Sequence, residues 1–284
     1  MNPIVRRAAV IGTGSIGASL AVAARKAGAI GHVIGVGRGR ANLAHAIDSG
    51  LVDEVSENPF AAVADVDLVV LATPVDSATQ LLPALVAAAP ERAIFTDVGS
   101  VKQPIVEAAV KCGVAERFVG GHPIAGGTGT GAIAADVDLF RGRTVVLTPT
   151  PEVAAGACAI VREVWAAVGA RVVEMTAARH DEVVALTSHL PQFVAFALCA
   201  SVGRSGEIDP ALFGTGFRDT TRLALSDHDM WLAIAELNRE SILQAMDRFA
   251  SLWLELRAAV AVGDTAALRR IFQEARDRKA RLSA

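Results

Sequence analysis

A histidine between glycines and a proline is the residue in this sequence best suited to proton transfer. The stretch GGHPIAG occupies residues 120–126 and places the imidazole of His122 directly before Pro123. Glycines allow the backbone to approach a ligand closely, and proline fixes the chain after the imidazole. A general base is one role for His122, and a hydrogen-bonded loop histidine is the alternative. The catalytic role is favoured because a complete nucleotide-binding unit precedes this stretch. We therefore predict a loop in which His122 meets the reactive ring of a nicotinamide.

Three other polar groups could act beside this histidine. Ser100 follows an apolar run, and we predict a site hydroxyl there, although a helix cap is its commonest use. The segment 214–222, GTGFRDTTR, holds Arg218 and Arg222 with an acid between them. This spacing favours an anion clamp over surface arginines. SHLPQ at 188–192 places His189 in an apolar helix with a proline, so His189 is predicted to be a hydrogen-bonded core residue, with a pocket residue as the alternative.

The element that must deliver the cofactor begins at the N-terminus. Residues 8–11 predict a buried strand, GTGSIG follows at 12–17, and an apolar helix continues to Ala27 with Gly28 after it. This glycine pattern provides a tight turn, close approach to a pyrophosphate and close packing of helix on strand. The helix N-terminus adds amide donors and a favourable dipole. The predicted cofactor-binding residues here are Gly12, Gly14, Ser15, Ile16 and Gly17.

The second strand, at 32–36, should end at the position that recognises the ribose. An acidic residue there favours the free 2′-hydroxyl of NAD. This chain instead has Gly37, Arg38 and Arg40. Guanidinium groups suit a 2′-phosphate, so the sequence predicts NADP, with NAD less favoured; two solvated loop arginines are the alternative.

Alternating strands and helices continue to about residue 175. The strand at 66–72 ends at Thr73 and Pro74, a predicted turn beneath the cofactor, and the strand at 93–97 leads to Ser100. We also predict a helix starting at 150–152 and strands at 143–148 and 171–175. Ligands bind beyond the carboxyl ends of such strands, so Thr73, Ser100 and His122 should share one rim. The chain after residue 176 shows only helical periodicity. We expect an α/β Rossmann-type domain at 1–175 and an all-α domain at 176–284.

The composition restricts the partners and the compartment. The 284 residues are 52% apolar and 20% charged with a net charge of −3, which disfavours nucleic-acid and membrane-surface partners. The three cysteines are scattered at apolar positions, so we expect buried thiols in a reducing cytoplasm and no metal site. Residues 183–203 lack charge over a membrane-spanning length, but His189 and Pro191 favour a buried helix of a soluble protein.

Five motifs in chain order resemble those of the prephenate/arogenate dehydrogenase family of tyrosine biosynthesis. They are GTGSIG at 12–17, DVGSVK at 97–102, RFVGGHPIAG at 117–126, SHLP at 188–191 and FRDTTR at 217–222, within about residues 8 to 250. Each motif is short, but their combined order is specific.

The resemblance implies a role for each matched residue. His122 would take the proton of the ring hydroxyl as hydride leaves the same carbon, and Ser100 would hold that hydroxyl. Arg222 would bind the substrate carboxylate, supported by Arg218. Trp231 would help to close the pocket near a subunit interface. The helical half would be a dimerisation domain, so the expected partners are a small-molecule substrate and a second copy of the chain.

Two departures from the family pattern bear on the substrate. Many prephenate-using members have a second histidine where this chain has Gln192, and an acid where it has Thr128. With Arg38 at the ribose position, these departures resemble the NADP-dependent branch that prefers arogenate. We therefore predict arogenate as substrate. The alternatives are prephenate, both substrates, or a modified prephenate.

Two other functional classes remain as alternatives. β-Hydroxyacid and imine reductases also join a nucleotide domain to a helical dimer domain. They usually carry a catalytic lysine after the domain junction, whereas the helical half here has only Lys279. A nucleotide-binding sensor without turnover would keep the glycines of 12–17 but has no need for His122, Ser100 and Arg222 together.

Overall fold

The computed structural model describes residues 2–126 and 129–282. Its contacts divide the chain into two compact units. The first comprises the chain up to Val183 together with Leu225–Asn238, and the second comprises Val184–Ala224 together with the chain from Arg239 onward. The segment 176–183 and the segment Leu225–Asn238 both follow the expected boundary at residue 175 in sequence, and by their contacts they belong to the first unit.

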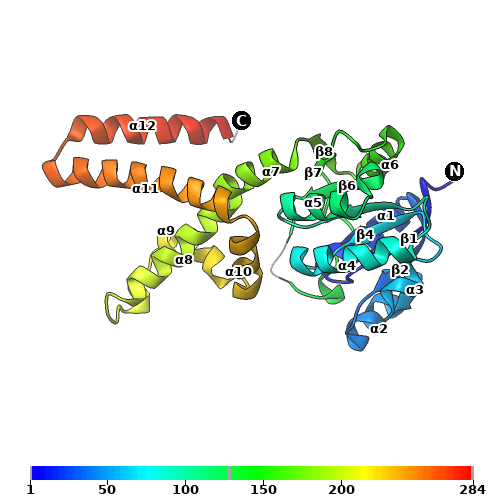
Figure 1. Ribbon diagram of the computed structural model, residues 1–284. Helices are drawn as coiled ribbons and strands as arrows, with labels where there is room; N and C mark the ends of the chain where they lie inside the picture. The colour runs from blue at the N-terminus through cyan, green and yellow to red at the C-terminus, as the bar shows by residue number, and fades with distance from the viewer. Residues whose placement is uncertain (1, 127–128, 283–284) are drawn as a thin grey trace. The chain divides into compact units, whose positions relative to one another are not determined.

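The first unit is built on one sheet with the order β3-β2-β1-β4-β5-β6-β7-β8 in the described residues (Figure 1). All neighbouring strands pair in parallel except β6 and β7, which are antiparallel. The first six strands have the order of a dinucleotide-binding fold, so the predicted α/β Rossmann-type domain is confirmed. The strands are β1 (Val5–Ile11), β2 (Ile30–Val36), β3 (Glu54–Ser56), β4 (Leu68–Leu71), β5 (Ile94–Asp97), β6 (Phe118–Pro123), β7 (Thr144–Thr148) and β8 (Arg171–Glu174).

Helices cover both faces of this sheet. The helices are α1 (Ser15–Lys26), α2 (Arg40–Asp48), α3 (Pro59–Ala62), α4 (Val75–Ala88), α5 (Gln103–Lys111) and α6 (Ala155–Ala167). One apolar core joins α1 and α6 to the sheet through Leu20 and Trp165. A second core joins α4 and α5 to the opposite face through Leu82 and Ile105. Because both faces are covered, the central strands are apolar at nearly every position.

The stretch around His122 is a strand for its first half, which corrects the predicted loop. Residues Gly120 to Pro123 pair with β7, and only the chain after them leaves the sheet. The glycines there serve close packing: a Cβ on Gly120 would lie 2.3 Å from Thr148 Oγ1, and one on Gly121 would lie 2.6 Å from the carbonyl oxygen of Asp97. The imidazole is therefore held by a rigid strand.

Helix boundaries match the sequence in some places and differ in others. Gly28 has φ +68° directly after the C-cap of α1, as predicted. Helix α6 begins at Ala155, later than the predicted start at 150–152, because Val153 N–H donates to the Thr150 carbonyl in a separate turn at 3.1 Å.

The second unit is helical, as expected for the C-terminal part. A π-helical turn (Ala185–His189) follows α7 (Ala177–Val184) and leads into α8 (Leu190–Gly203). Pro191 lies in the first turn of α8, where a proline needs no N–H partner, so the helix accommodates it through the preceding π-turn. The unit also contains α9 (Thr215–Thr221), α11 (Arg239–Val262) and α12 (Thr265–Leu282).

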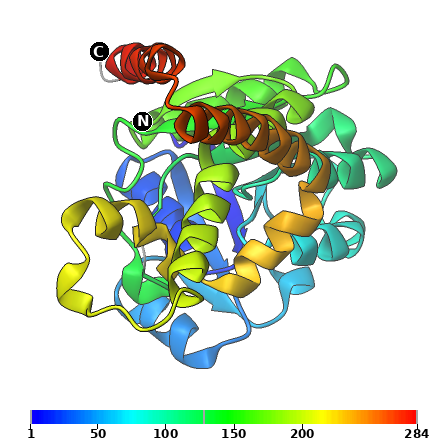
Figure 2. The ribbon, with the colours of Figure 1, turned by 90° about the vertical axis from the view of Figure 1, so that its left-hand side faces the viewer.

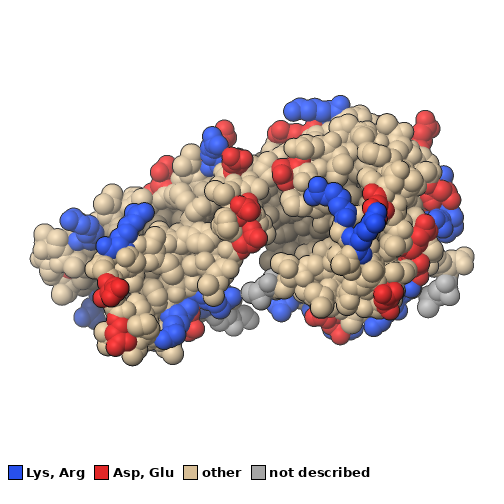
Figure 3. All heavy atoms as spheres, turned by 90° about the horizontal axis from the view of Figure 1, so that it is seen from below, with Lys and Arg blue, Asp and Glu red and all other residues tan. Residues whose placement is uncertain are grey.

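Much of this helical surface is apolar and exposed within a single chain. Figures 1 and 2 show α11 and α12 running side by side. Trp253 on α11 and Phe272 on α12 are 60% and 61% exposed. By length and composition alone, Ala177–Gly203 could cross a membrane, and only 28% of its apolar window is buried. The expectation of a buried helix is therefore wrong for one chain by itself. On the face in Figure 3, acidic and basic side chains are interspersed.

Candidate active site

Three predicted site residues lie at the carboxyl ends of neighbouring strands. Thr73 follows β4, Ser100 follows β5, and His122 is the penultimate residue of β6. These strands are adjacent and parallel, so the three residues share one edge of the sheet. The Ser100 hydroxyl has no hydrogen-bond partner among residues 2–126 and 129–282, and Ser100 does not cap α5, whose N-cap is Lys102. Ser100 thus remains available for a ligand.

A pocket of about 850 Å³ lies at the same edge of the sheet. Its lining includes Gly12, Gly37, Arg38, Thr73 and Pro74. A Cβ on Gly12 would lie 2.5 Å from the Ala72 carbonyl oxygen, and one on Gly17 would lie 2.1 Å from the Gly12 carbonyl oxygen. Only glycine permits this approach of the turn to β4 and to its own helix.

The local chemistry fits a dinucleotide. Helix α1 starts at Ser15 after Gly14, with no side-chain cap and no acid in its first turn, so its amides and its dipole can receive a phosphate. Nothing lies within 4 Å of where a Cβ of Gly14 would be. The Thr73 hydroxyl is buried and has no partner among the described residues, as expected of a group that meets a ligand. The residues present therefore fit a nucleotide cofactor.

Thr13 and Asn42 join the glycine turn to a segment far along the chain. The Asn42 amide donates to the Thr13 carbonyl at 2.7 Å and to its hydroxyl at 2.8 Å, and it accepts from Ala132 N–H at 2.6 Å. Ser15 adds a hydrogen bond to the Ala134 carbonyl at 3.3 Å. These contacts fix the turn and one wall beside it. Sequence reasoning missed Thr13 and Asn42.

The two arginines predicted at the ribose position have different surroundings. Arg38 is exposed and lines the pocket, which Glu57 also borders. Arg40 donates to the Glu57 carboxylate at 3.0 Å and lines a different depression over α2 and β3. The structure therefore places Arg38, but not Arg40, at the pocket.

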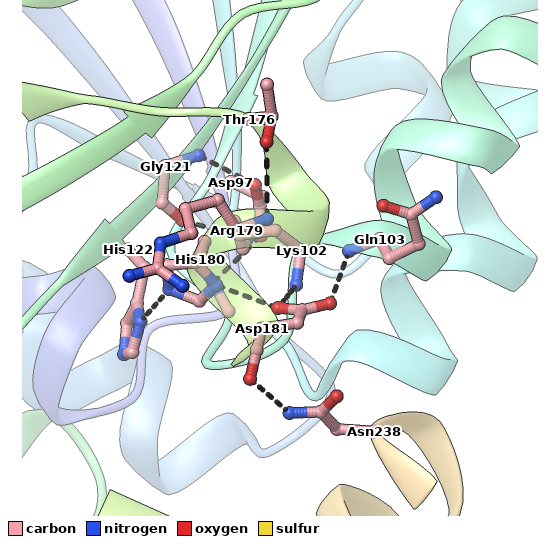
Figure 4. A network of polar contacts seen from close by, with 11 residues as sticks. Asp97, Lys102, Gln103, Gly121, His122, Thr176, Arg179, His180, Asp181 and Asn238 are labelled. Carbon is pink, nitrogen blue, oxygen red and sulfur yellow. Dashed lines mark hydrogen bonds and ion pairs between the residues drawn. The ribbon is translucent and has the colours of Figure 1, made fainter. Parts of the chain in front are cut away.

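A buried ion pair connects the loop that carries Ser100 to the strand that carries His122 (Figure 4). The ammonium of Lys102 bonds the Asp97 carboxylate and the Gly121 carbonyl oxygen, the latter at 2.9 Å. Asp97 also accepts from the amides of Gly99 at 2.8 Å and Gly121 at 3.0 Å. Burial lowers the pKa of Lys102, and the nearby Asp97 carboxylate opposes that shift.

A chain of polar contacts connects His122 to α7. His122 Nδ1 lies 2.7 Å from His180 Nε2, and His180 Nδ1 lies 2.7 Å from Asp181 Oδ1 (Figure 4). Asn238, at the end of α10 (His228–Leu237), donates to the Asp181 carbonyl at 3.0 Å. His180, Asp181 and Asn238 are at most 5% exposed. Burying these polar groups without hydrogen bonds would destabilise the folded state, so the contacts hold α7 in place.

The remaining predicted substrate residues lie mostly in the second unit. Arg222 is exposed, and its guanidinium has no partner among the described residues. Arg218 donates to the carbonyls of Phe213 at 3.0 Å and Pro210 at 3.3 Å, so it shapes its own loop. Buried Gln192 donates to the Leu223 carbonyl at 2.6 Å, next to Arg222.

The positions of the three other predicted residues differ. His189 is buried in the π-turn. Trp231 lies half-buried on α10, which belongs to the first unit. Thr128 falls outside the described residues.

Lys102, His180 and Asp181 were not singled out from the sequence. Lys102 ends the DVGSVK motif, and its apolar surroundings gave a signal of burial. The His-Asp pair at 180–181 shortly precedes the uncharged run at 183–203, which also gave a signal of burial. Only the fold brings this pair to His122, 58 residues earlier.

Comparison with known proteins agrees with this geometry. The family profile "Prephenate dehydrogenase, nucleotide-binding domain" matches residues 20–174, and "Prephenate dehydrogenase, dimerization domain" matches 176–274. A prephenate dehydrogenase of Bacillus subtilis is 31% identical, over 98% of this chain and 76% of its own length.

Two solved structures are similar over nearly the whole chain. Prephenate dehydrogenase from A. aeolicus, in complex with hydroxyphenyl propionate and NAD+, is 30% identical with a TM-score of 0.92 and covers 98% of both chains. Synechocystis arogenate dehydrogenase is also 30% identical, with a TM-score of 0.85, and covers 97% of this chain and 99% of its own. With matches of this extent to both halves, the chain belongs to the prephenate/arogenate dehydrogenase family of NAD(P)-dependent enzymes in tyrosine biosynthesis.

Proposed function

We propose that this enzyme converts arogenate to tyrosine with NADP as hydride acceptor. The observation that carries the chemistry is the placement of His122 and Ser100 at adjacent strand ends beside the nucleotide pocket. His122 takes the proton of the ring hydroxyl, and Ser100 orients that hydroxyl. A bound nicotinamide would supply the acceptor for the hydride that leaves the same carbon. The bond to the ring carboxylate breaks, carbon dioxide leaves, and the ring becomes aromatic, so the protein supplies mainly position and a base.

Arg222 is the proposed partner of the substrate carboxylate. Its guanidinium can form forked, charge-assisted hydrogen bonds, and no described protein group occupies it. Gln192 supports this role from behind, because its bond to the Leu223 carbonyl holds the backbone directly after Arg222. Arg218 acts on the same segment through its loop contacts.

The preference for NADP is supported by Arg38, which lines the pocket at the end of β2 where NAD enzymes usually have an acid. Glu57 borders the same pocket and could instead accept from a ribose hydroxyl, but its bond to Arg40 partly neutralises it. Replacing Arg38 with serine should therefore weaken NADP more than NAD. Replacing Glu57 with glutamine should weaken NAD more if Glu57 contacts the ribose.

The preference for arogenate is supported by Gln192. The amide is neutral and buried, so it adds no positive charge to a pocket that receives a side chain bearing an amino group. Many prephenate-using relatives place a histidine at this position. A histidine can become positively charged and so suits the additional negative charge of prephenate.

We also propose a cytoplasmic homodimer with the functional division at 1–175 and 176–284. The three cysteines are free thiols, which suits a reducing compartment. The exposed apolar side chains of α11 and α12 belong to the segment that matches the dimerisation profile. The two family profiles end and begin at residues 174 and 176, which supports the functional division.

The test is a comparison of kcat/KM for arogenate and prephenate, each with NADP and NAD. His122→Ala should lower kcat about 10²- to 10⁴-fold, the usual contribution of a general base. His32→Ala, on β2 and paired with Glu54, is the matched control and should leave kcat unchanged. A preference for prephenate would contradict the arogenate proposal, and higher kcat/KM with NAD would contradict the role of Arg38. Tight NADP binding without any product would favour a sensor.

A further inference from the structure

The contacts of the Asp181 carboxylate determine where the protons lie in the chain from His122 to α7. Oδ1 accepts from the amide of Lys102 at 2.8 Å, and Oδ2 accepts from the amide of Gln103 at 2.9 Å. These amides form the N-terminus of α5, where the helix dipole favours a negative charge. A carboxylate that accepts on both oxygens is ionised and has no proton to donate.

The two imidazoles must then donate in one direction. Because Asp181 only accepts, the proton on His180 resides on Nδ1, 2.7 Å from Oδ1. Neutral His180 is left with an unprotonated Nε2, which can only accept. His122 Nδ1 lies 2.7 Å from that atom, so Nδ1 of His122 carries the donated proton. The lone pair of His122 is therefore on Nε2.

We propose that His180 and Asp181 are positioning residues that fix the tautomer of His122, leaving Nε2 as the base. This inference deepens the proposed function and rests on it, because it concerns the nitrogen that would receive the substrate proton. The rings meet edge to face, with centroids 5.0 Å apart and an interplanar angle of 72°, so the orientation of His122 is fixed together with its protonation. Neither residue touches the reacting atoms; both act through His122.

The same contacts stabilise the charge that forms during the reaction. When Nε2 of His122 takes the substrate proton, the ring becomes an imidazolium. Its Nδ1–H bond can then break as an N–H bond forms at His180 Nε2, so no further proton acceptor is required. The positive charge moves next to the Asp181 carboxylate. Of the other charged groups drawn in Figure 4, Asp97 and Lys102 form their own ion pair, and Arg179 pairs with Glu182.

Burial makes this arrangement effective. His180 is 1% exposed and Asp181 is 3% exposed, so water competes little for their hydrogen bonds. Asn238 holds the Asp181 backbone through its carbonyl, and the α5 amides hold its carboxylate. The geometry is thus defined from three elements: α5, α7 and α10.

The primary test is ¹⁵N NMR of histidine-labelled wild-type enzyme without substrate, with His122→Asn and His180→Gln used to assign the two rings. At a pH where both rings are neutral, each should show a pyrrole-like Nδ1 and a pyridine-like Nε2. A pyrrole-like Nε2 on His122 would overturn the proposal. This measurement needs no turnover. The expected tautomer without activity on either substrate would reject only the proposed function, and turnover with the opposite tautomer would reject only the positioning role.

Kinetics of two variants provide the second arm. His180→Leu removes the acceptor for His122 and should lower kcat roughly 10- to 100-fold, a part of what a general base contributes, while substrate KM and cofactor Kd stay unchanged. His180→Gln keeps one acceptor and one donor on its amide and should restore most of kcat. Equal losses in both variants, or a loss confined to thermal stability, would indicate a purely structural histidine and overturn the inference.

Discussion

Replacing Lys102 with methionine should destabilise the first unit strongly. The lysine side chain is 0% exposed, and its ammonium is the only described cation that bonds Asp97. Methionine keeps most of the buried chain length but removes the positive charge. The buried Asp97 carboxylate then keeps only its two amide donors, and the Gly121 carbonyl oxygen loses the hydrogen bond from Lys102. Removing one partner of a buried ion pair typically costs about 3–5 kcal/mol. We expect a loss of that size in the free energy of unfolding.

The assay is urea unfolding followed by circular dichroism at one fixed protein concentration, because the proposed dimer would make apparent stability depend on concentration. Lys111→Met is the matched control: this exposed lysine ends the same helix, and its loss should change stability by less than about 0.5 kcal/mol. Adding Asp97→Asn to Lys102→Met removes the stranded charge and should recover part of the loss. The reasoning is refuted if Lys102→Met costs under about 1 kcal/mol, or if the double variant is no more stable than the single one.

Lys102→Met should affect the positions of Ser100 and His122 but not the glycine turn at 12–17. Asp97 accepts hydrogen bonds from the amides of Gly99 and Gly121, which directly precede Ser100 and His122. We therefore expect kcat to fall in Lys102→Met under conditions where the protein remains folded. The cofactor Kd should change little, because the turn at 12–17 lies between β1 and α1 and has no contact with Lys102 among the described hydrogen bonds. Equal effects on kcat and cofactor Kd would contradict this separation.

Three further predictions concern the cofactor turn and the substrate arginine. Gly17→Ala places a Cβ 2.1 Å from the Gly12 carbonyl oxygen, so calorimetry should show cofactor affinity reduced by roughly 10- to 100-fold, equivalent to about 1–3 kcal/mol of overpacking. Asn42→Ala removes the hydrogen bonds to Thr13 and Ala132 and should weaken cofactor binding while kcat at saturation stays near wild type; an unchanged cofactor Kd would argue against its role. Arg222→Gln should raise substrate KM about 10- to 100-fold through the loss of charged hydrogen bonds, with cofactor Kd unchanged as the internal control.

The amino-acid pattern alone was enough to predict the class of fold and the nucleotide-binding end of the first unit. The continuous apolar runs, GTGSIG and Gly28 depend on local backbone requirements, so they could be read without knowledge of distant contacts. The shared edge of Thr73, Ser100 and His122 followed from the rule that parallel strands end at one edge. These predictions succeeded because each depends on a few neighbouring residues and a general property of α/β sheets.

The conformation around His122 depends on contacts between strands and could not be predicted from the sequence. The glycines at 120–121 resemble a flexible loop in sequence, but they are required because β6 passes close to Thr148 and the Asp97 carbonyl. A glycine needed for loop freedom and one needed for close packing look alike in a sequence. The distinction rests on atoms from β5 and β7.

The hydrogen-bond partners of His122 and of the glycine turn were also set by the tertiary structure. His180 and Asp181 lie 58 and 59 residues after His122, and Asn42 lies 90 residues before its partner Ala132. Nothing in local spacing links these residues, because the hydrogen bonds form only after α7 and the segment at 131–136 have packed on the first unit. The sequence therefore pointed to His122 as the candidate base, whereas the fold revealed the groups proposed to hold its proton in place.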